Sequence, residues 1–510
     1  MLIKVYSSAV FGINAQLITI EVFVDKGIGY HLVGLPDNAI KESSYRIAAA
    51  LANNKYKLPG KKITINMAPA DLRKEGSAYD LPISVAILAA SEQISITKFD
   101  DTIILGELSL DGSVLPIKGA LPIAIQAKKD GFKKLILPFD NANESAIVDG
   151  IEVYGVKNIM EVIDIIYGKN NIKPTKINTR ELFFESYSKA QFDFSDVKGQ
   201  ESVKRAMEIA AAGGHNIILV GPPGSGKTML AKRISSILPP MSLHEALETT
   251  KIHSVIGKVN SLGLIAQRPF RAPHHTCSSV ALVGGGGYPQ PGELSLAHNG
   301  VLFLDELPEF KRDVLEVMRQ PLEDREVTIA RAKYTITYPS SVMLVASMNP
   351  SPSGYFLDES ASIQSLNDMR KYLAKVSGPL LDRIDLHIEV NPVPFEELSS
   401  TIKGESSEEI RKRVVKARDI QLERFKNIEN IYYNAQMHSY LLDDYCKLDQ
   451  TSLKLLKKAM DRLNLSARAY DRILKVARTI ADLDEKTSIE PGHIAEAIQY
   501  RSLDREGWLT

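Results

Sequence analysis

The chain has 510 residues, 44% of them hydrophobic and 24% charged, which is typical of a globular protein with about two to four domains. Its 62 basic and 62 acidic side chains cancel, so no global field attracts nucleic acid, and any DNA contact must come from local patches. The two cysteines, Cys277 and Cys446, exclude a disulfide framework and indicate a reducing compartment.

The first residues predict strands rather than a targeting signal. Apolar residues alternate with polar or small ones up to Val24, and no basic segment precedes an unbroken apolar stretch. No part of the chain approaches the roughly 18 apolar residues that a membrane-spanning helix needs. We therefore expect a cytoplasmic protein without a membrane span.

Residues 1–168 are predicted to form an α/β or α+β domain. Strand-like runs such as ITIEVFV, KITINMA and KLILP alternate with helical runs such as LPISVAILAASEQ and NIMEVIDIIYG. The following residues, 169–191, are polar, lack a clear period and contain Pro174, so we interpret them as a linker.

Residues 192–393 are predicted to form a doubly wound α/β core. Three short apolar runs, NIILVG, VLFLDE and VMLVASMN, are typical of buried parallel strands. In residues 394–510 helical segments dominate, among them SEEIRKRVVKARDIQLERF and SARAYDRILKVARTIADL. This last part is predicted to be an all-α lid.

The segment GPPGSGKT fits the phosphate-binding pattern G-x-x-x-x-G-K-[ST], and it lies between a predicted strand and a predicted helix. Glycines let backbone N–H groups curl around phosphates, and the helix N-terminus adds partial positive charge. Lys227 is expected to reach the β- and γ-phosphates of ATP, and Thr228 to bind Mg²⁺. The predicted nucleotide-binding residues are Gly221, Pro222, Pro223, Gly224, Ser225, Gly226, Lys227 and Thr228.

Polar side chains follow the two later apolar runs. Asp305 is predicted to hold Mg²⁺ with Thr228, and Glu306 to polarise the attacking water. Asn349 is predicted to position that water, although an Asn-Pro pair is also a common turn signal. Because the carboxyl ends of parallel strands meet at one edge of a sheet, we expect these side chains to converge.

Two arginine-containing segments are candidates for stabilising charge during hydrolysis. Arg383, flanked by Asp382 and Asp385, is either part of a surface ion-pair network or an arginine finger for a neighbouring subunit's ATP site. Arg468 and Arg472 are four residues apart on one helical face. One of them is expected to contact the γ-phosphate from the lid.

Together these motifs resemble those of magnesium-chelatase-like AAA+ ATPases. The segments NMAPADLRKEGSAYDLPISVAILAA, FRAPHHTCSSVALVGGG and PGELSLAHNGVLFLDEL are more closely similar to the YifB/ComM competence-protein family, and the similarity covers nearly the whole chain. The resemblance implies a Lon-like (ribosomal S5-type) domain at 1–168, an AAA+ core with an insertion in its second helix, and a helical lid at 394–510.

The resemblance also implies hexameric rings and, for the competence protein, ATP-driven DNA branch migration during natural transformation. It implies that Arg383 is the arginine finger that acts in the ATP site of a neighbouring subunit. It also implies that Arg468 is the sensor arginine of the helical lid. Two other functions stay open, namely an ATP-driven protein remodeller like the magnesium-chelatase motor subunit and a Lon-like peptidase.

The peptidase alternative needs a Ser–Lys dyad. Alignment with the Lon patterns places Ala78 at the nucleophile position and Leu121 at the lysine position. Without a nucleophile and its base there is no covalent route. Only a register slip, with Ser77 paired to Lys74 or Lys118, would restore a dyad, so we interpret the domain as non-proteolytic.

DNA contact is predicted at a hairpin formed by EVTIARAKYTITYP. The runs VTIA and YTITY alternate in polarity, with Arg331 and Lys333 at or near the turn. An ordinary solvated turn has the same pattern. Related AAA+ helicases carry a hairpin at this position that points into the pore, where both cations would contact phosphates.

The preceding segment, FRAPHHTCSSVALVGGGGYPQPGE, corresponds to the helix-2 insertion, and its four glycines predict a mobile loop that faces DNA or another subunit. His274, His275 and Cys277 match no closed zinc site.

Many family members have cysteines after the position of Asn349, whereas this chain has none there. The polar stretch 351–369 is instead expected to be disordered.

Overall fold

The computed structural model describes residues 1–95, 100–169, 172–179, 192–332, 334–354, 363–399 and 403–501. Two compact units emerge from its internal contacts. The first comprises residues 1–186 with 242–266, and the second comprises 187–241 with 267–510. Residues 242–266, which the sequence analysis places inside the 192–393 core, thus group with the N-terminal unit.

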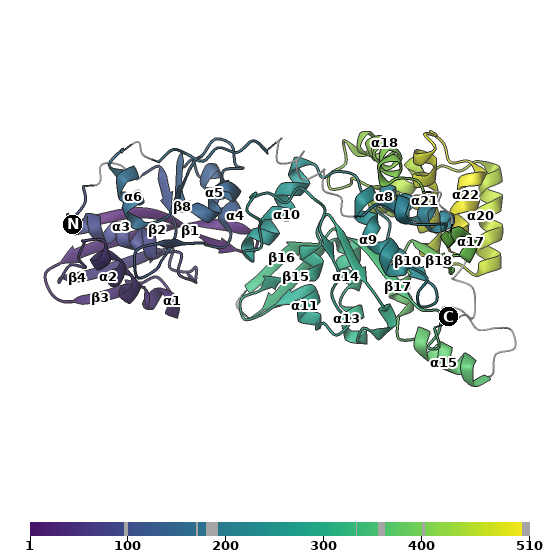
Figure 1. Cartoon of the computed structure of the whole chain (residues 1–510), viewed down its shortest axis with the longest axis horizontal. Coiled ribbons are helices and arrows are strands. Elements are labelled where there is room, and N and C mark those ends of the chain that lie inside the picture. The colour runs from purple at the N-terminus through teal and green to yellow at the C-terminus, as the bar shows by residue number, and fades with distance from the viewer. Residues whose placement is uncertain are drawn as a thin grey trace. The chain divides into compact units, whose positions relative to one another are not determined.

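The first unit is built on a seven-stranded mixed sheet with the order β3-β4-β2-β1-β5-β8-β9 (Figure 1). The long β1 and β2 pair antiparallel, while β5, β8 and β9 continue the sheet in parallel. Its strands are β1 Leu2–Phe11, β2 Asn14–Asp25, β3 Gly29–Val33, β4 Lys62–Ala68, β5 Thr102–Ile104, β8 Lys134–Pro138 and β9 Glu152–Val156. A separate small pair joins β6 Glu107–Leu108 to β7 Val114–Leu115.

Helices pack on this sheet to form its two apolar cores. Its helices are α1 Asn38–Lys41, α2 Ser43–Asn53, α3 Asp80–Ala90, α4 Ala120–Lys129, α5 Phe139–Ser145, α6 Ile159–Ile166 and α10 Leu243–Val255. Every residue of α3 is buried. The Asp80 carboxylate at its start is compensated by Arg46, whose Nε lies 2.6 Å away, as a buried charge requires.

Helix α10 belongs to this unit although the residues directly before and after the segment 242–266 belong to the second unit. A capping box between Ser242 and Glu245 starts the helix. The Gly119 N–H donates to the Ser254 carbonyl at 2.9 Å, and Asn143 Nδ2 donates to the Ser261 carbonyl at 3.0 Å. These bonds attach the segment to both ends of the α4–α5 region.

The second unit contains a five-stranded parallel sheet with the order β11-β14-β17-β10-β18. Its strands are β11 Phe270–Arg271, β14 Val301–Leu304, β17 Met343–Met348, β10 Ile217–Val220 and β18 Leu386–Glu389. The three runs predicted as buried strands are β10, β14 and β17, and all three are fully buried. The order places them side by side in the middle of the sheet.

This part of the second unit also contains α-helices and two short 3-10 helices. The α-helices are α8 Glu201–Gly213, α9 Lys227–Ile237, α11 Ser279–Val283, α12 Glu293–Leu296, α13 Arg312–Glu316, α14 Arg319–Asp324, α15 Ile363–Leu373 and α16 Gly378–Leu381, and the 3-10 helices are η1 Phe194–Asp196 and η2 Leu307–Glu309. Two hairpins complete this part. They are β12 Gly284–Gly285 with β13 Gln290–Pro291, and β15 Glu326–Arg331 with β16 Tyr334–Pro339. The predicted hairpin with Arg331 at its end is therefore present.

The remaining elements are helical, namely α17 Phe395–Ser399, α18 Ser407–Phe425, η3 Asn434–Gln436, α19 Ser439–Tyr445, α20 Gln450–Leu463, α21 Ala467–Leu483 and α22 Pro491–Gln499. A mixed α/β protein with parallel strands and a helical C-terminal region is confirmed. Within the range 351–369, α15 begins at Ile363, so helix replaces part of the expected disorder.

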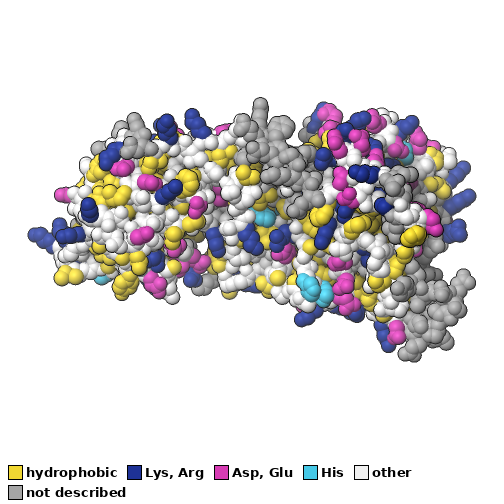
Figure 2. All heavy atoms as spheres, viewed as in Figure 1, with side chains coloured by type: hydrophobic (Ala, Val, Ile, Leu, Met, Phe, Trp, Pro, Cys, Tyr) yellow, Lys and Arg dark blue, Asp and Glu magenta, His cyan; other side chains and the backbone are white. Residues whose placement is uncertain are grey.

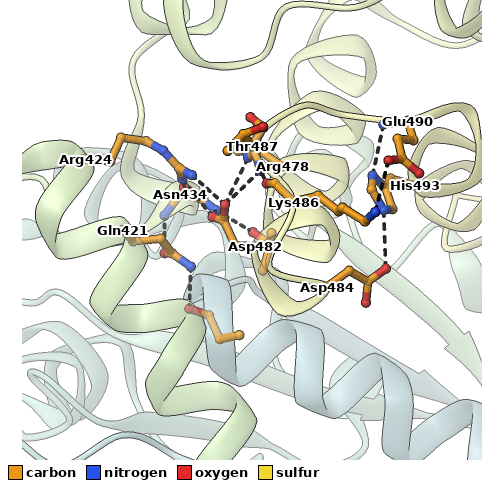
Figure 3. A network of polar contacts seen from close by, with 12 residues as sticks. Gln421, Arg424, Asn434, Arg478, Asp482, Asp484, Lys486, Thr487, Glu490 and His493 are labelled. Atoms are coloured by element: carbon orange, nitrogen blue, oxygen red, sulfur yellow. Dashed lines mark hydrogen bonds and ion pairs between the residues drawn. The ribbon is translucent and has the colours of Figure 1, made fainter.

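A buried polar network joins the C-terminal helices (Figure 3). The fully buried Asp482 accepts from Arg424 Nη1 at 2.7 Å, from Asn434 Nδ2 at 2.7 Å and from Arg478 Nε at 3.1 Å. Gln421 Nε2 donates to the Ala212 carbonyl at 3.1 Å and so ties α18 to α8. These bonds satisfy a carboxylate that water does not reach.

The outer surface of this region is highly charged. Figure 2 shows Lys and Arg interspersed with Asp and Glu over α18. Lys412 Nζ, for example, lies 2.8 Å from Glu409 and 3.4 Å from Glu408. Such exposed pairs contribute little to stability, so this surface is a solvated face.

Candidate nucleotide-binding and interface sites

The predicted phosphate loop connects β10 to α9. Gly224 and Gly226 have φ of 78° and 91°, which glycine adopts without strain. A Cβ on Gly221 would clash with the Val390 carbonyl oxygen, so only glycine allows this close approach. The Ser225 hydroxyl is buried and, among the described residues, has no hydrogen-bond partner. The loop therefore fits a bound phosphate, whose oxygens accept such donors.

The ammonium group of Lys227 lies inside this loop. Its Nζ donates to the carbonyls of Gly221 at 2.7 Å and Pro222 at 2.8 Å, and to Asn349 Oδ1 at 3.2 Å. Burial lowers the pKa of Lys227, while Asp305 and Glu306 act in the opposite direction. The cation is thus held by neutral acceptors that a phosphate can replace.

Thr228 and Asp305, the predicted magnesium pair, are in direct contact. Thr228 Oγ1 donates to Asp305 Oδ2 at 2.7 Å, and the Ser347 hydroxyl donates to Oδ1. A hydroxyl beside a carboxylate is an oxygen donor set that suits Mg²⁺. The sequence analysis missed Ser347 because nothing distinguishes a serine inside a buried strand until the neighbouring strand is placed beside it.

Glu306 has a left-handed backbone with φ of 54° and a largely exposed side chain. His275 Nδ1, from the segment after β11, lies 3.5 Å from Glu306 Oε2. The sequence analysis considered His275 only as a zinc ligand. Within the described ranges, no group of three or more His, Cys, Asp or Glu side chains is arranged to hold a metal ion.

Asn349 directly follows β17, and its contact with Lys227 brings it to the phosphate loop. The carboxyl ends of β14, β17 and β10, which are neighbours in the sheet, therefore contribute Asp305, Asn349 and the loop to one place. The structure brings together the predicted residues from all three strand ends.

Arg383 lies at the opposite, amino edge of the same sheet. It precedes β18, and its carbonyl accepts from Asn216 Nδ2, which precedes β10, at 2.8 Å. β10 has four residues and spans about 13 Å. Arg383 is thus separated by the length of the strand from the phosphate loop of its own chain.

The guanidinium group of Arg383 makes two polar contacts and has one buried N–H donor without a partner among the described residues. One terminal nitrogen donates to the Pro379 carbonyl at 2.7 Å, and the other pairs with Glu323. In the described part of the chain, the buried Nε has no hydrogen-bond partner. The ion pair with Glu323 is what the ion-pair alternative for Arg383 predicts, and it leaves the arginine-finger alternative as a prediction.

Arg468 lies with Arg383 on a pocket of about 350 Å³ at this amino edge. Its Nη1 is 3.7 Å from Asp382 Oδ2, and its side chain is 61% exposed. Arg325, Arg472 and Lys475 line the same pocket. Arg468 is thus grouped with Arg383 and not with Lys227.

Three acids, Glu323, Asp385 and Asp471, also line this pocket, and the buried one, Asp385, pairs with Arg472 and with His215 Nδ1 at 3.2 Å. Burial raises its pKa, but Arg472 and His215 outweigh burial and hold the pKa below its ordinary value. Burial also lowers the pKa of Arg325 to about 10 and lowers that of Lys475. Basic side chains thus outnumber acidic ones in the lining of the pocket, and its charges range from buried, such as Asp385, to largely exposed, such as Arg468.

In the N-terminal unit, the residues of the peptidase alternative have separate partners. The Ser77 hydroxyl donates to Glu107, whereas Lys74 Nζ donates to the Pro69 carbonyl. Leu121 is buried in α4. The hydrogen bonds described for Ser77 and Lys74 thus do not join them as a nucleophile and its base.

At the β15–β16 hairpin, Arg331 is exposed, and its Nε donates to the Gly286 carbonyl at 3.4 Å. Lys333, the second predicted DNA contact, lies outside the described residues.

Among the helices that the structure describes, none combines the length and apolar character that crossing a bilayer requires.

Three family models match parts of the chain. The family described as "Magnesium chelatase, subunit ChlI" matches residues 193–398, and its C-terminal counterpart matches 404–501. The family "Subunit ChlI of Mg-chelatase" matches residues 20–141. The fold and these matches define a magnesium-chelatase-like AAA+ protein.

Full-length relatives narrow the assignment. The chain is 45% identical over 506 residues to the protein YifB of Escherichia coli and 44% identical over 503 residues to competence protein ComM of Haemophilus influenzae. Each alignment covers 98% of this chain and 97% of the relative. The chain therefore belongs to the YifB/ComM family. A partial match, 28% identical over 183 residues, links it to the archaeal Lon protease of Methanocaldococcus jannaschii.

Proposed function

We propose that this protein hydrolyses ATP in a closed ring, with each active site formed by two subunits. The observation that carries the proposal is the separation of Arg383 and Arg468 from Lys227 by the sheet of a single subunit. A neighbour that presents its cation-rich pocket to the phosphate loop would supply the missing positive charge. In a ring this contact repeats and closes, and a hexamer is the expected form.

The residues then have distinct roles. Lys227 exchanges its carbonyl partners for the β- and γ-phosphates, and Thr228 with Asp305 holds the Mg²⁺ that neutralises phosphate charge. Glu306 accepts a proton from the attacking water, which Asn349 orients. Arg383 of the adjacent subunit stabilises charge on the transferred phosphoryl group, with Arg468 beside it.

We propose that ATP hydrolysis drives movement of this protein along branched DNA during recombination. The support is the full-length similarity to a competence protein together with the exposed Arg331 on a hairpin. In a ring, one such cation per subunit would produce a local positive surface despite the zero net charge. Branch migration of incoming strands during natural transformation is the corresponding biological role.

A subunit-mixing experiment tests the shared site. Arg383→Ala subunits retain an intact phosphate loop, and Lys227→Ala subunits retain an intact finger. Blends of the two inactive variants should recover ATPase activity because some interfaces combine two intact halves. Zero recovery at every ratio would contradict action in trans.

A second candidate is an ATP-driven protein remodeller, favoured by the magnesium-chelatase matches over residues 193–398 and 404–501. A panel of single-stranded, duplex, forked and four-way DNA in an ATPase assay separates the two. The DNA motor predicts stimulation by at least one DNA. Indifference to all four, with stimulation by a protein partner, would favour the remodeller.

A further inference from the structure

Two basic side chains in the pocket at the amino edge of the sheet, hereafter the amino-edge pocket, form no ion pair with any described residue. They are Arg325 and Lys475, and both are partly buried. The charge of Asp385 acts on both of them, but this carboxylate is already paired with Arg472 and His215. Basic side chains that leave bulk water are normally paired, so an anion is the expected ligand of this pocket.

Two further donors in the lining of the amino-edge pocket are buried and unused. Ser340 is 1% exposed, and its hydroxyl has no hydrogen-bond partner among the described residues. The buried Nε of Arg383 has none either in this part of the chain. The Ser340 N–H donates to the Arg325 carbonyl at 2.8 Å, so these two residues lie side by side. Because a buried donor without an acceptor costs free energy, a ligand with acceptor oxygens fits here.

The positive charges of this pocket also repel each other. Burial lowers the pKa of Lys475, and Arg472 and Arg325 lower it further against the opposing charge of Asp385. Like charges that are partly removed from water destabilise a folded chain unless an anion lies between them. Residues that are kept at such a cost are typical of a binding site.

From these observations we infer that the amino-edge pocket binds a phosphate group, held by Arg325 and Lys475 with the Ser340 hydroxyl as a further donor. A phosphate group carries nearly two negative charges at neutral pH and several acceptor oxygens, so it matches two cations and a neutral donor. A carboxylate carries one charge and would leave one cation unpaired. The phosphate is either free inorganic phosphate or the phosphate end of a nucleotide.

The effect of this ligand on hydrolysis rests on the proposed function. A phosphate in the amino-edge pocket would neutralise positive charge that the proposed ring offers to the ATP of the next subunit. Inorganic phosphate should therefore lower kcat in the assembled protein and leave KM for ATP nearly unchanged. Phosphate that returned to the phosphate loop would instead compete with ATP and raise KM.

The binding test uses the full chain with Lys227→Ala, which disables the phosphate loop, so that the remaining phosphate binding reports on the pocket. Calorimetric titration with inorganic phosphate should show one phosphate per chain. Arg325→Gln and Lys475→Gln should each weaken this binding at least about tenfold, because hydrogen bonds between charged groups are the strong ones. Arg312→Gln and Lys457→Gln remove exposed cations elsewhere in the same unit and should leave it unchanged.

Thermal unfolding of the same proteins separates binding from a structural role. Without phosphate, Lys475→Gln should be at least as stable as its parent, because it removes a cation that its neighbours repel. Added phosphate should raise the Tm of the parent but not that of the variant. A strongly destabilised Lys475→Gln would make this lysine structural and contradict the inference.

Absence of phosphate binding, or binding that both Gln variants retain, would overturn the inference. Equally tight binding of acetate would overturn it as well and assign the pocket to carboxylates. Displacement of phosphate by ADP would identify a nucleotide as the source of the phosphate group, whereas no displacement would identify free phosphate. Binding that does not lower kcat would leave the phosphate site in place and count against the shared ATP site.

Discussion

The two edges of the parallel sheet in the second unit have opposite chemistry. At the carboxyl edge, Asp305 and Glu306 accompany one lysine that is held by carbonyl oxygens. At the amino edge, five arginines and one lysine line a pocket together with the three acids Glu323, Asp385 and Asp471. The same strands thus carry the predicted phosphate loop at one end and an excess of basic over acidic side chains at the other. The proposed site between neighbouring subunits would use this difference, because the amino edge of one subunit would supply the positive charge that the carboxyl edge of the next one lacks.

The largest effect is expected at the carboxyl edge itself. Lys227→Ala should reduce hydrolysis by about a thousandfold or more, because the β- and γ-phosphates lose their only loop cation. ATP binding, measured with a fluorescent analogue, should weaken as well. Lys232→Ala, an exposed lysine on the same helix, is the control. A Lys227→Ala protein that hydrolyses ATP at the wild-type rate would contradict the assignment of the ATP site to the carboxyl edge of the sheet.

Arg383→Ala should lower kcat by about a thousandfold and leave ATP affinity nearly unchanged, because a finger acts on charge that develops only during transfer. Steady-state kinetics of the assembled protein separates the two parameters. Arg312→Ala, an exposed arginine of α13, serves as the control. A large rise in KM with normal kcat would make Arg383 a binding group and weaken the contrast between the edges.

Asp385→Asn should destabilise the protein by about 3 kcal/mol at neutral pH, because Arg472 loses its buried partner. The folded-state pKa of Asp385 is depressed. Its stabilisation is therefore present above the unfolded value of about 3.9 and lost as pH falls through the folded pKa. Urea unfolding at several pH values should show the gap between wild type and variant closing in acid. The exposed Asp461→Asn should show no such gap at any pH.

The smallest effect is expected at His275. Its contact with Glu306 would draw that carboxylate away from the nucleotide, so His275→Ala should raise the basal ATPase rate by about threefold. His274→Ala, which removes the ring tilted against His275 with centroids 4.1 Å apart, is the neighbouring control. A strong loss of activity in His275→Ala alone would mean that this histidine supports Glu306 rather than restrains it.

Much of this arrangement could be predicted from the sequence. The three apolar runs were predicted as strands because buried parallel strands are short, continuous and apolar. Lys227, Thr228, Asp305 and Asn349 were predicted to converge because each follows directly from such a strand or its loop. Ser347 and His275 could not be found in this way, since both act through contacts between segments distant in sequence.

The sequence by itself determined the phosphate loop, the order of α and β segments and the family, since these depend on local pattern and spacing. Only the tertiary structure decided that Arg383 and Arg468 share a pocket at the far edge of the sheet from Lys227. It also assigned residues 242–266 to the N-terminal unit. The reason is physical: a motif records which groups are available, whereas the direction and order of strands in the folded sheet fix which groups can meet.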